Sequence, residues 1–483
     1  MNKVKFLIDK YKGINVQAKA SIWYTICNVL QKGISFITVP IYVRILTTAE
    51  YGKYAVFQSW RDILIIFVTL NLYCGIYTKA MVDYEDDRDR YTSCMQGLGT
   101  VITGIFFVIY LVKYQFWNSL FEMNTITMIL LFLYYVCYPA LSFWSVRQRV
   151  QYKYVSMVVV TMVTSVLTPV VSLVLLLCTD LREVAVIWGY LLVQIAFGAF
   201  FYIYQFLKGK VFYVADYWKH AIKFNIPLIP HYLSLIVLGQ ADRIMIKEIC
   251  GEDKAGIYSL AYQVSSIMNI IIAAINGSLV PWSYENLKKK NYAKIASLGN
   301  GLCVLMGVMT LGVAMISPEI IWILGGKTYM EAKWIVPVVA LSVYFTFCYN
   351  QFCTVEFYYS KTQFIMVASS LGAVLNIVLN AIFIPMFGYM AAGYTTLVCY
   401  VFFAFFHYLF MKKICRERLN GVAVYDVKKM VLISLVLLIT TAISMMMYNT
   451  YLIRYGCILL MGVVVLLNYK KILSMLKDMK NKG

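Results

Sequence analysis

The sequence predicts an all-α polytopic membrane protein with about 14 transmembrane helices. Hydrophobic residues make up 61% of the chain and charged residues 14%, against about 25% charged residues in soluble proteins. Apolar runs of roughly 20 residues recur along the chain, and a helix of that length crosses about 30 Å of hydrocarbon. These runs do not alternate in polarity as the strands of an outer-membrane barrel do. The composition therefore excludes a soluble domain and a membrane barrel.

The apolar runs place the spans in order along the chain. The expected spans cover about 20–43, 54–78, 94–112, 125–146, 155–178, 184–207, 226–249, 256–279, 297–317, 335–358, 364–384, 390–411, 429–448 and 451–469. The intervening segment 208–225 is basic and aromatic, so we expect a linker along the membrane surface.

The distribution of charge predicts the orientation of the chain. The formal net charge is +20, and Lys and Arg gather in alternate loops rather than in a basic domain that would bind nucleic acid. Examples of such clusters are Arg147 with Arg149, Lys208 with Lys210, Lys288–Lys290 and Arg416 with Arg418. Basic residues are retained on the cytoplasmic side, so we expect a multi-pass membrane protein with both termini in the cytoplasm.

Two short motifs recur about 200 residues apart. Residues 49–54 (AEYGKY) are echoed by 253–258 (DKAGIY), and 83–85 (DYE) by 283–285 (SYE). The offset contains six spans, so the two halves would have the same orientation around an axis normal to the membrane. We therefore expect two six-helix lobes in a parallel repeat. The predicted division is an N-terminal lobe at 1–207, the linker at 208–225, a C-terminal lobe at 226–411, and two extra spans with a basic tail at 412–483.

The stretch 226–258 carries polar residues inside a membrane-length apolar run. His231, Gln240, Asp242 and Arg243 lie within it, and a charge at the centre of a membrane helix costs about 2.5–3.5 kcal/mol on insertion scales. Such residues persist where they face the protein interior or a watery cavity. Asp242 or His231 could take up a proton there; alternatively, Asp242 and Arg243 form a structural ion pair.

Other intramembrane polar residues extend the set of candidates. Lys32 lies mid-span, Arg61 is adjacent to Asp62, and Glu356 stands among aromatic residues near the end of its span. Asn376 and Asn380 share a helical face and either line a cavity or hydrogen-bond neighbouring helices. The substrate-binding candidates are Lys32, Arg61, Arg243, Asn28, Gln240, Asn376 and Asn380, and the ion-coupling candidates are Asp62, His231, Asp242 and Glu356. The cations Lys32, Arg61 and Arg243, against few interior acids, favour an anionic substrate such as a lipid-linked phosphate or pyrophosphate.

The sequence carries no signature of catalysis or of a bound cofactor. It has no GxSxG, HExxH, Walker A or Rossmann glycine motif. The twelve Cys lie mostly inside apolar runs, with no CxxC pair and no His at metal-ligand spacing, so we expect core residues and no metal site. We therefore expect a transporter and not an enzyme.

Three segments resemble bacterial polysaccharide flippases. They are VPIYVRILTTAEYGKYAVFQSW (39–60), ADRIMIKEICGEDKAGIYSLAYQV (241–264) and ILGGKTYMEAKWIVPVVALS (323–342). This family belongs to the multidrug/oligosaccharidyl-lipid/polysaccharide exporter superfamily. The resemblance implies two lobes around a cationic cavity, alternating access, and an undecaprenyl-pyrophosphate-linked oligosaccharide as substrate, for capsule, O-antigen or exopolysaccharide synthesis. It also implies coupling to a proton or sodium gradient.

Two alternatives remain open. One is an ion-coupled exporter of drugs or other small molecules with the same architecture, which would require dominant intramembrane acids. The other is a membrane polysaccharide polymerase, which would be expected to carry a large outer loop; the longest outer loop here, about 318–334, is short. For a flippase, we expect a polymerase and glycosyltransferases as functional partners, and no nucleic acid.

Overall fold

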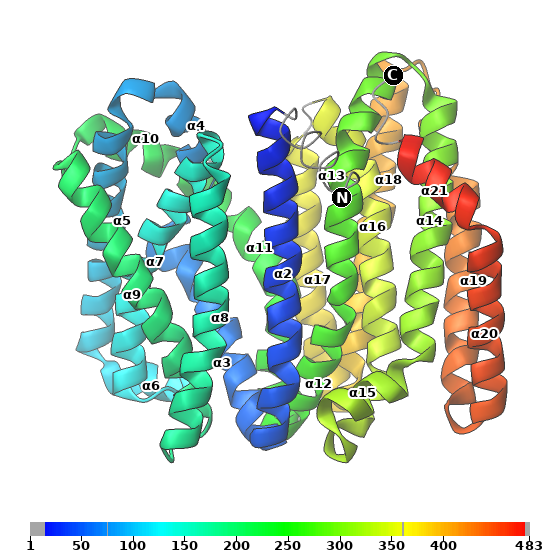
Figure 1. Ribbon diagram of the computed structural model, residues 1–483, viewed down its shortest axis with the longest axis horizontal. Helices are drawn as coiled ribbons and strands as arrows, with labels where there is room; N and C mark the ends of the chain where they lie inside the picture. Colours follow the sequence, from blue (N-terminus) through cyan, green and yellow to red (C-terminus); the bar gives the residue numbers. More distant parts are fainter. Residues whose placement is uncertain (1–14, 75, 360–361, 479–483) are drawn as a thin grey trace, which may run out of the picture. The chain divides into compact units, whose positions relative to one another are not determined.

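The protein is helical along its described length. The computed structural model describes residues 15–74, 76–359 and 362–478, and within these ranges the chain consists of helices and short connections, without a β-strand (Figure 1). In hydrocarbon, a helix satisfies its own backbone hydrogen bonds, which is why long apolar runs adopt this form. The predicted all-α class is confirmed.

Contacts within the chain define two compact units. Unit 1 contains the first helix up to Ile41 and the segment Lys53–Ile236, and unit 2 contains Tyr42–Gly52 and the chain from Val237 onward. Unit 1 includes α3 (Thr48–Thr69, from Lys53), α4 (Ile76–Asp83), η1 (Glu85–Asp87), α5 (Arg88–Val112), α6 (Tyr114–Phe121), α7 (Thr125–Val150), α8 (Tyr154–Cys178), α9 (Glu183–Gly209), α10 (Ala215–Asn225) and η2 (Ile226–Leu228). Helices α2 (Val16–Ile45), α3 and α11 (Ile229–Cys250) each cross the division.

Unit 2 continues with the second half of the helices. These are α12 (Glu252–Ser265), α13 (Ile267–Lys288), α14 (Tyr292–Met315), α15 (Ser317–Gly325), η3 (Lys327–Trp334), α16 (Val336–Tyr358), α17 (Thr362–Phe387), α18 (Ala391–Arg418), α19 (Val427–Met446), η4 (Met447–Asn449), α20 (Tyr451–Leu467) and α21 (Tyr469–Asp478). The predicted lobe boundaries at 207, 225 and 411 stay a prediction.

Each predicted span coincides with a helix or a pair of helices. Among the described residues, eleven helices are long and apolar enough to cross a membrane, or twelve if the bent pair formed by α10–η2 and α11 is one span. Helix α20 is apolar but has 17 residues, and α3 carries Arg61 and Asp62 within its 22 residues. The structure thus confirms a polytopic helical membrane protein.

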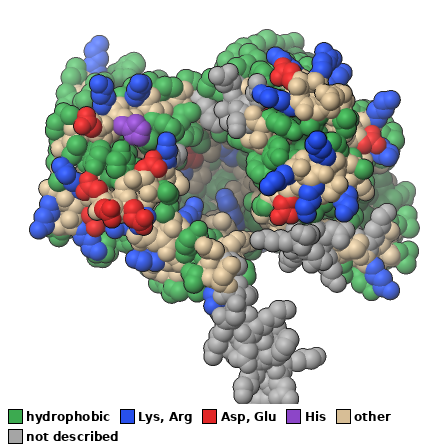
Figure 2. All heavy atoms as spheres, turned by 90° about the horizontal axis from the view of Figure 1, so that it is seen from above, with side chains coloured by type: hydrophobic (Ala, Val, Ile, Leu, Met, Phe, Trp, Pro, Cys, Tyr) green, Lys and Arg blue, Asp and Glu red, His purple; other side chains and the backbone are tan. Residues whose placement is uncertain are grey.

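Many helix ends follow an alternation of basic residues. The last turns of α7, α9, α13 and α18 carry Lys or Arg, and those of α5, α8, α14, α17 and α19 carry neither; α2 and α11, which end with Arg44 and Lys247, and α16, which ends without a basic residue, depart from it. Figure 2 shows one end of the molecule, on which Lys and Arg side chains are spread between hydrophobic ones. This alternation is the pattern that the positive-inside rule uses, and the cytoplasmic location of the termini stays a prediction.

The span expected over 54–78 is interrupted. Helix α3 ends at Thr69, and Leu70 and Asn71 follow with positive φ values of 50° and 48° before α4 begins. The turn is buried, and the Thr103 hydroxyl on α5 donates to the Val68 carbonyl at 3.2 Å. This hydroxyl lies 35 residues away in sequence and supplies the hydrogen bond that the Val68 carbonyl lacks where the helix ends. The free-energy cost of the interruption inside the membrane is therefore smaller than hydropathy alone suggests.

The segment expected to be a linker contains a helix. The basic segment 208–225 contains α10, which packs on α5 in unit 1: Trp218 Nε1 donates to the Cys94 carbonyl at 3.0 Å. The Tyr217 hydroxyl donates to Asp87 Oδ2 at 2.5 Å, and Ala221 is fully buried. The linker is therefore anchored to unit 1 by specific contacts.

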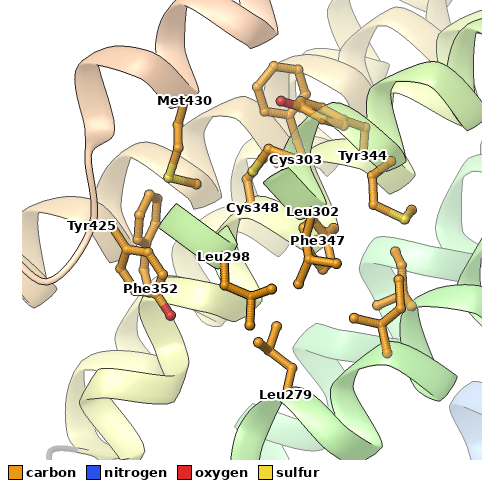
Figure 3. Close-up of a cluster of buried hydrophobic side chains, with 14 of the residues drawn as sticks. Leu279, Leu298, Leu302, Cys303, Tyr344, Phe347, Cys348, Phe352, Tyr425 and Met430 are labelled. Carbon is orange, nitrogen blue, oxygen red and sulfur yellow. The ribbon is translucent and has the colours of Figure 1, made fainter. Parts of the chain in front are cut away.

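The core of unit 2 is built from large side chains of several helices. Leu298, Leu302 and Cys303 of α14 face Tyr344, Phe347, Cys348 and Phe352 of α16, with Leu279 of α13 and Tyr425 and Met430 beside them (Figure 3). The Tyr344 hydroxyl lies 3.1 Å from the Ser434 hydroxyl of α19. Helix α19, the first of the two extra spans, therefore shares the core of unit 2.

The two glycines of the repeated motif lie against each other's helices. A Cβ atom on Gly52 would lie 2.0 Å from the Glu252 carbonyl oxygen, and one on Gly256 would lie 2.1 Å from the Thr48 carbonyl oxygen. The Thr48 hydroxyl donates to Asp253 beside this crossing. The N-terminal turns of α3 and α12 thus approach so closely that neither position has room for a side chain.

We expect Gly256→Ala to destabilise the protein, because the new methyl group meets a backbone carbonyl that cannot rotate away. Overpacking of this kind costs roughly 1–3 kcal/mol. Gly277→Ala, also inside a helix, is the matched control, since a Cβ there would meet nothing within 4 Å. Thermal unfolding of the purified protein in detergent measures both. Equal melting temperatures for the two variants would contradict the close approach.

The carboxylate of Glu331, outside the predicted spans, binds two other segments of unit 2. Glu331 Oε2 in η3 accepts hydrogen bonds from Lys254 Nζ of α12 and from the Tyr389 hydroxyl, each at 2.6 Å. Both hydrogen bonds stabilise the carboxylate and hold the pKa of Glu331 below its ordinary value of 4.5. The bond from Lys254 has the larger effect and that from Tyr389 the smaller one.

This lowered pKa predicts a loss of stability in acid. In the unfolded chain, the pKa of Glu331 has its ordinary value of 4.5. The contribution of Glu331 to folding stability is therefore fully present above pH 4.5, and it is lost as the pH falls through the lower pKa of the folded state. Glu331→Gln should lower the melting temperature at neutral pH by a small amount, since exposed pairs contribute about 0–1 kcal/mol. The difference between variant and wild type should shrink in acid; a difference that stays constant down to pH 3 would contradict this assignment.

Candidate transport sites

Asp242 is the centre of a polar network inside unit 2. It lies on α11, one face of which packs against α12, α17 and α18, and only 1% of its surface is exposed. The apolar neighbours Leu238, Cys399 and Phe403 surround it with a small hydrophobic cluster. An ionised carboxylate in such a place requires hydrogen-bond donors in place of water.

Three neutral donors from three helices supply this need. The Tyr258 hydroxyl of α12 donates to Oδ2 at 2.6 Å, the Thr396 hydroxyl of α18 donates to Oδ2 at 2.7 Å, and Asn380 Nδ2 of α17 donates to Oδ1 at 2.7 Å. The network extends further, because Asn376 Nδ2 donates to the Thr396 hydroxyl at 3.2 Å. Asp242 thus connects four helices of unit 2.

The network is rich in oxygen ligands. The hydroxyl of Thr395 donates to Asn380 Oδ1, and Asn380 Nδ2 also lies 3.3 Å from Asn376 Oδ1. One carboxylate with amide and hydroxyl oxygens is a ligand set that hard cations prefer. All members are at least 95% buried. The arrangement can hold one small cation, or one proton on Asp242, without leaving net charge in the lobe.

Arg243 does not use Asp242 as its hydrogen-bond partner. Its Nη1 atom donates to the Gly239 carbonyl at 2.9 Å and to Gln240 Oε1 at 2.5 Å, and its guanidinium carbon lies 4.6 Å from the centre of the Tyr262 ring. The alternative of a structural Asp242–Arg243 ion pair is therefore wrong. The hydrogen-bond and ring partners of Arg243 are thus neutral groups.

Arg61 in unit 1 does form an ion pair. Its Nε and Nη2 atoms donate to Asp62 Oδ1 at 2.9 and 2.7 Å, and its guanidinium carbon lies 4.5 Å from the centre of the Tyr190 ring. Tyr134 and Tyr138 of α7 add further rings beside Tyr190. This part of unit 1 combines a cation with several aromatic faces, a combination suited to sugar and phosphate groups.

The candidates on the first helix are accessible. The side chains of Asn28 and Lys32 on α2 are both exposed. The side chain of His231 lies outside the part of the chain that the structure describes, so its role stays a prediction. Asn376 and Asn380, expected among the substrate-binding residues, are fully buried in the Asp242 network. We therefore group them with Asp242.

Glu356 belongs to a separate buried cluster. It is 0% exposed, and its Oε1 atom lies 2.9 Å from Nδ1 of His407 on α18. His407 and Cys353 are partners that sequence reasoning missed. The available signal was a lone histidine within the aromatic run of the twelfth span, 51 residues from Glu356 along the chain.

Unit 1 also contains an apolar pocket of about 180 Å³. Its walls come from α3, α5, α6 and α7, and they include Phe67, Phe106, Trp117 and Phe132. The lining is almost entirely carbon, so the pocket is unsuited to a pyrophosphate and contains none of the predicted site residues.

Comparison with known proteins identifies the family. A family model described as "polysaccharide biosynthesis protein" matches residues 18–287, more than half of the chain. The chain belongs to this polysaccharide biosynthesis family. The resemblance seen in the sequence motifs is therefore confirmed.

Two relatives from Haemophilus influenzae are similar in sequence. One, a protein of the Lsg locus, is 27% identical over 180 residues, which cover 36% of this chain and 43% of that relative. The chain thus matches less than half of the length of this relative. The other, an uncharacterised membrane protein, is 25% identical over 380 residues and covers 74% of this chain and 88% of the relative.

Solved structures show the fold. The lipid II flippase MurJ in an inward closed conformation has a TM-score of 0.65 at 15% identity, covering 93% of this chain and 100% of that one. An inward-facing multidrug resistance MATE family transporter of the MOP superfamily has a TM-score of 0.61 at 10% identity, covering 82% and 96%. This member of the polysaccharide biosynthesis family therefore has the same fold as these two membrane proteins.

Proposed function

We propose that this protein is a flippase that moves undecaprenyl-pyrophosphate-linked oligosaccharide repeat units from the inner to the outer leaflet of the bacterial cytoplasmic membrane. The family match to polysaccharide biosynthesis proteins carries this proposal, and the transporter fold supports it. Alternating access would expose the polar head group to one side at a time, while the lipid tail stays in the bilayer. The product would then serve a polymerase in capsule, O-antigen or exopolysaccharide synthesis.

The cationic residues support an anionic head group. Arg243 makes its described contacts with neutral partners, Lys32 is exposed on α2, and Arg61 lies over a tyrosine ring. Arginine binds phosphate through several hydrogen bonds in a fixed geometry. In the proposed cycle, each of these residues is a candidate partner of the pyrophosphate in its own unit, and the tyrosine rings beside Arg61 would contact the sugars.

The Asp242 network is the proposed site of ion coupling. A proton or a sodium ion would neutralise the carboxylate, and the oxygens of Asn376, Asn380, Thr395 and Thr396 lie within the same hydrogen-bonded network. Ion binding would therefore change the contacts between α11, α17 and α18. A change of this kind alters the relative stability of two conformations, as coupling requires.

The flippase function can be tested by the leaflet location of the lipid-linked glycan. In cells lacking the protein, we expect completed repeat units to accumulate where a membrane-impermeant sugar-modifying reagent cannot reach them in intact spheroplasts. Lys32→Ala and Arg243→Ala should each reproduce this accumulation and reduce surface polysaccharide at least tenfold, because the pyrophosphate loses a charge partner. Lys413→Ala and Arg416→Ala, at exposed positions of α18, are matched controls and should behave as wild type.

The other outcomes identify the alternatives. Repeat units that reach the outer leaflet but remain unpolymerised would indicate a polymerase. Unchanged glycolipid would indicate an exporter of other small molecules. If the positive charge is what binds the substrate, Arg243→Lys should retain part of the transport activity that Arg243→Ala loses. Wild-type activity of both alanine variants, at normal protein levels, would contradict the cationic site.

The coupling role of Asp242 has a separate test. In proteoliposomes, an imposed sodium or proton gradient should accelerate transport by the wild type. The same gradient should leave the transport rate of Asp242→Asn unchanged, since a neutral amide cannot balance the charge of a bound cation. Asp216→Asn, at an exposed carboxylate of α10, is the control. If sodium is the coupling ion, NaCl should raise the melting temperature of the wild type but not that of Asp242→Asn. KCl should raise neither. A variant that responds to the gradient as the wild type does would exclude Asp242.

A further inference from the structure

Three buried side chains of different chemistry converge in unit 2, apart from the Asp242 network. Cys353 and Glu356 stand three residues apart on one face of α16, and His407 faces them from α18. Their exposed fractions are 5%, 0% and 1%. Side chains at this spacing on a helix lie one above the other, so two ligands from α16 meet one from α18.

The distances are those of a shared centre. Nδ1 of His407 lies 2.9 Å from Glu356 Oε1 and 3.2 Å from Cys353 Sγ, and the three ligand atoms all lie within 4.8 Å of one another. The Glu356 carboxylate approaches Nδ1, whereas the Cys353 sulfur lies beside both ring nitrogens, at 3.2 Å from Nδ1 and 3.7 Å from Nε2. Nitrogen, oxygen and sulfur atoms this close together can bind one metal ion.

A second observation concerns the remaining carboxylate oxygen. Glu356 Oε2 is buried and has no hydrogen-bond partner among the described residues. An unpartnered carboxylate oxygen in an apolar interior costs at least about 1–3 kcal/mol. A cation at the cluster would bind this oxygen together with Oε1, and so remove that cost.

The ring of His407 is also held in place. Tyr349 stacks on it at a centroid distance of 5.4 Å, and Phe403 lies at 5.8 Å. Aromatic packing of this kind fixes the direction of the ring nitrogens. Metal ligands gain affinity when surrounding residues fix their orientation.

We propose that Cys353, Glu356 and His407 bind a zinc ion that connects α16 to α18. Thiolate, imidazole and carboxylate are the three ligand types that zinc uses, and a thiolate with a carboxylate neutralises the divalent charge. A neutral complex suits the low-dielectric interior of the lobe. The site would hold two helices of unit 2 together, and it rests on this cluster alone, independently of the proposed transport function.

Metal content tests the proposal directly. Protein expressed with added zinc and purified without chelator should contain about one zinc per chain by mass spectrometry, and Cys353→Ser and His407→Gln should each lower this at least fivefold. Cys348→Ser, a buried cysteine on the same helix without a histidine partner, is the matched control and should retain zinc. Wild-type protein without zinc would overturn the proposal.

Spectroscopy distinguishes this site from zinc bound elsewhere. Cobalt-substituted wild type and Cys348→Ser should show a near-ultraviolet thiolate-to-cobalt band, and Cys353→Ser should lack it. A band of equal strength in Cys353→Ser would overturn the assignment. If a variant fails to fold, the wild type alone still decides: a membrane-permeant chelator should lower its melting temperature, and added zinc should restore it. No change on chelation would count against a structural zinc.

Discussion

A carboxylate buried among apolar helices needs donors to replace water, and this requirement organises unit 2. Asp242 satisfies it with hydroxyl and amide groups from α12, α17 and α18. Removal of any of these helices would leave a buried charge with too few partners, which is costly in an apolar interior. The positions of α11, α12, α17 and α18 therefore depend on one another. The apolar contacts around Leu238 then fill the remaining space.

The same requirement explains where helices can break inside the bundle. After α3, the Thr103 hydroxyl binds the Val68 carbonyl, and between α12 and α13 the Ser265 hydroxyl binds the carbonyls of Ala261 and Val336. At the first break the hydroxyl supplies a donor that the helix no longer provides, and at the second it joins the end of α12 to α16. Irregular backbone at such a depth is tolerated only where the protein itself satisfies it.

Hydropathy predicted the helices because each apolar run carries its own requirement for a helical backbone. It could not predict the breaks, since the donors come from side chains such as Thr103, which lies 35 residues from its acceptor. The cost of membrane burial identified Asp242, Arg243 and Glu356 as special residues. Their partners could not be predicted, because Asn380 and His407 lie 138 and 51 residues away in sequence. The Asp242–Arg243 pair was wrong for the same reason: the donors to Asp242 come from α12, α17 and α18, which lie far from it in sequence.

A buried charge in the two extra helices, α19 and α20, is also balanced by a partner from another helix. Arg454 of α20 is 0% exposed and pairs with Glu319 of α15, and the rings of Tyr448, Tyr451 and Tyr455 surround its guanidinium group. The Tyr455 hydroxyl also donates to Glu319 at 2.8 Å. A buried arginine without this carboxylate would be strongly unfavourable, so α20 is bound to α15 by more than apolar contact. Together with the Tyr344–Ser434 contact of α19, this pair makes the extra helices an integral part of unit 2 rather than an appendage to it.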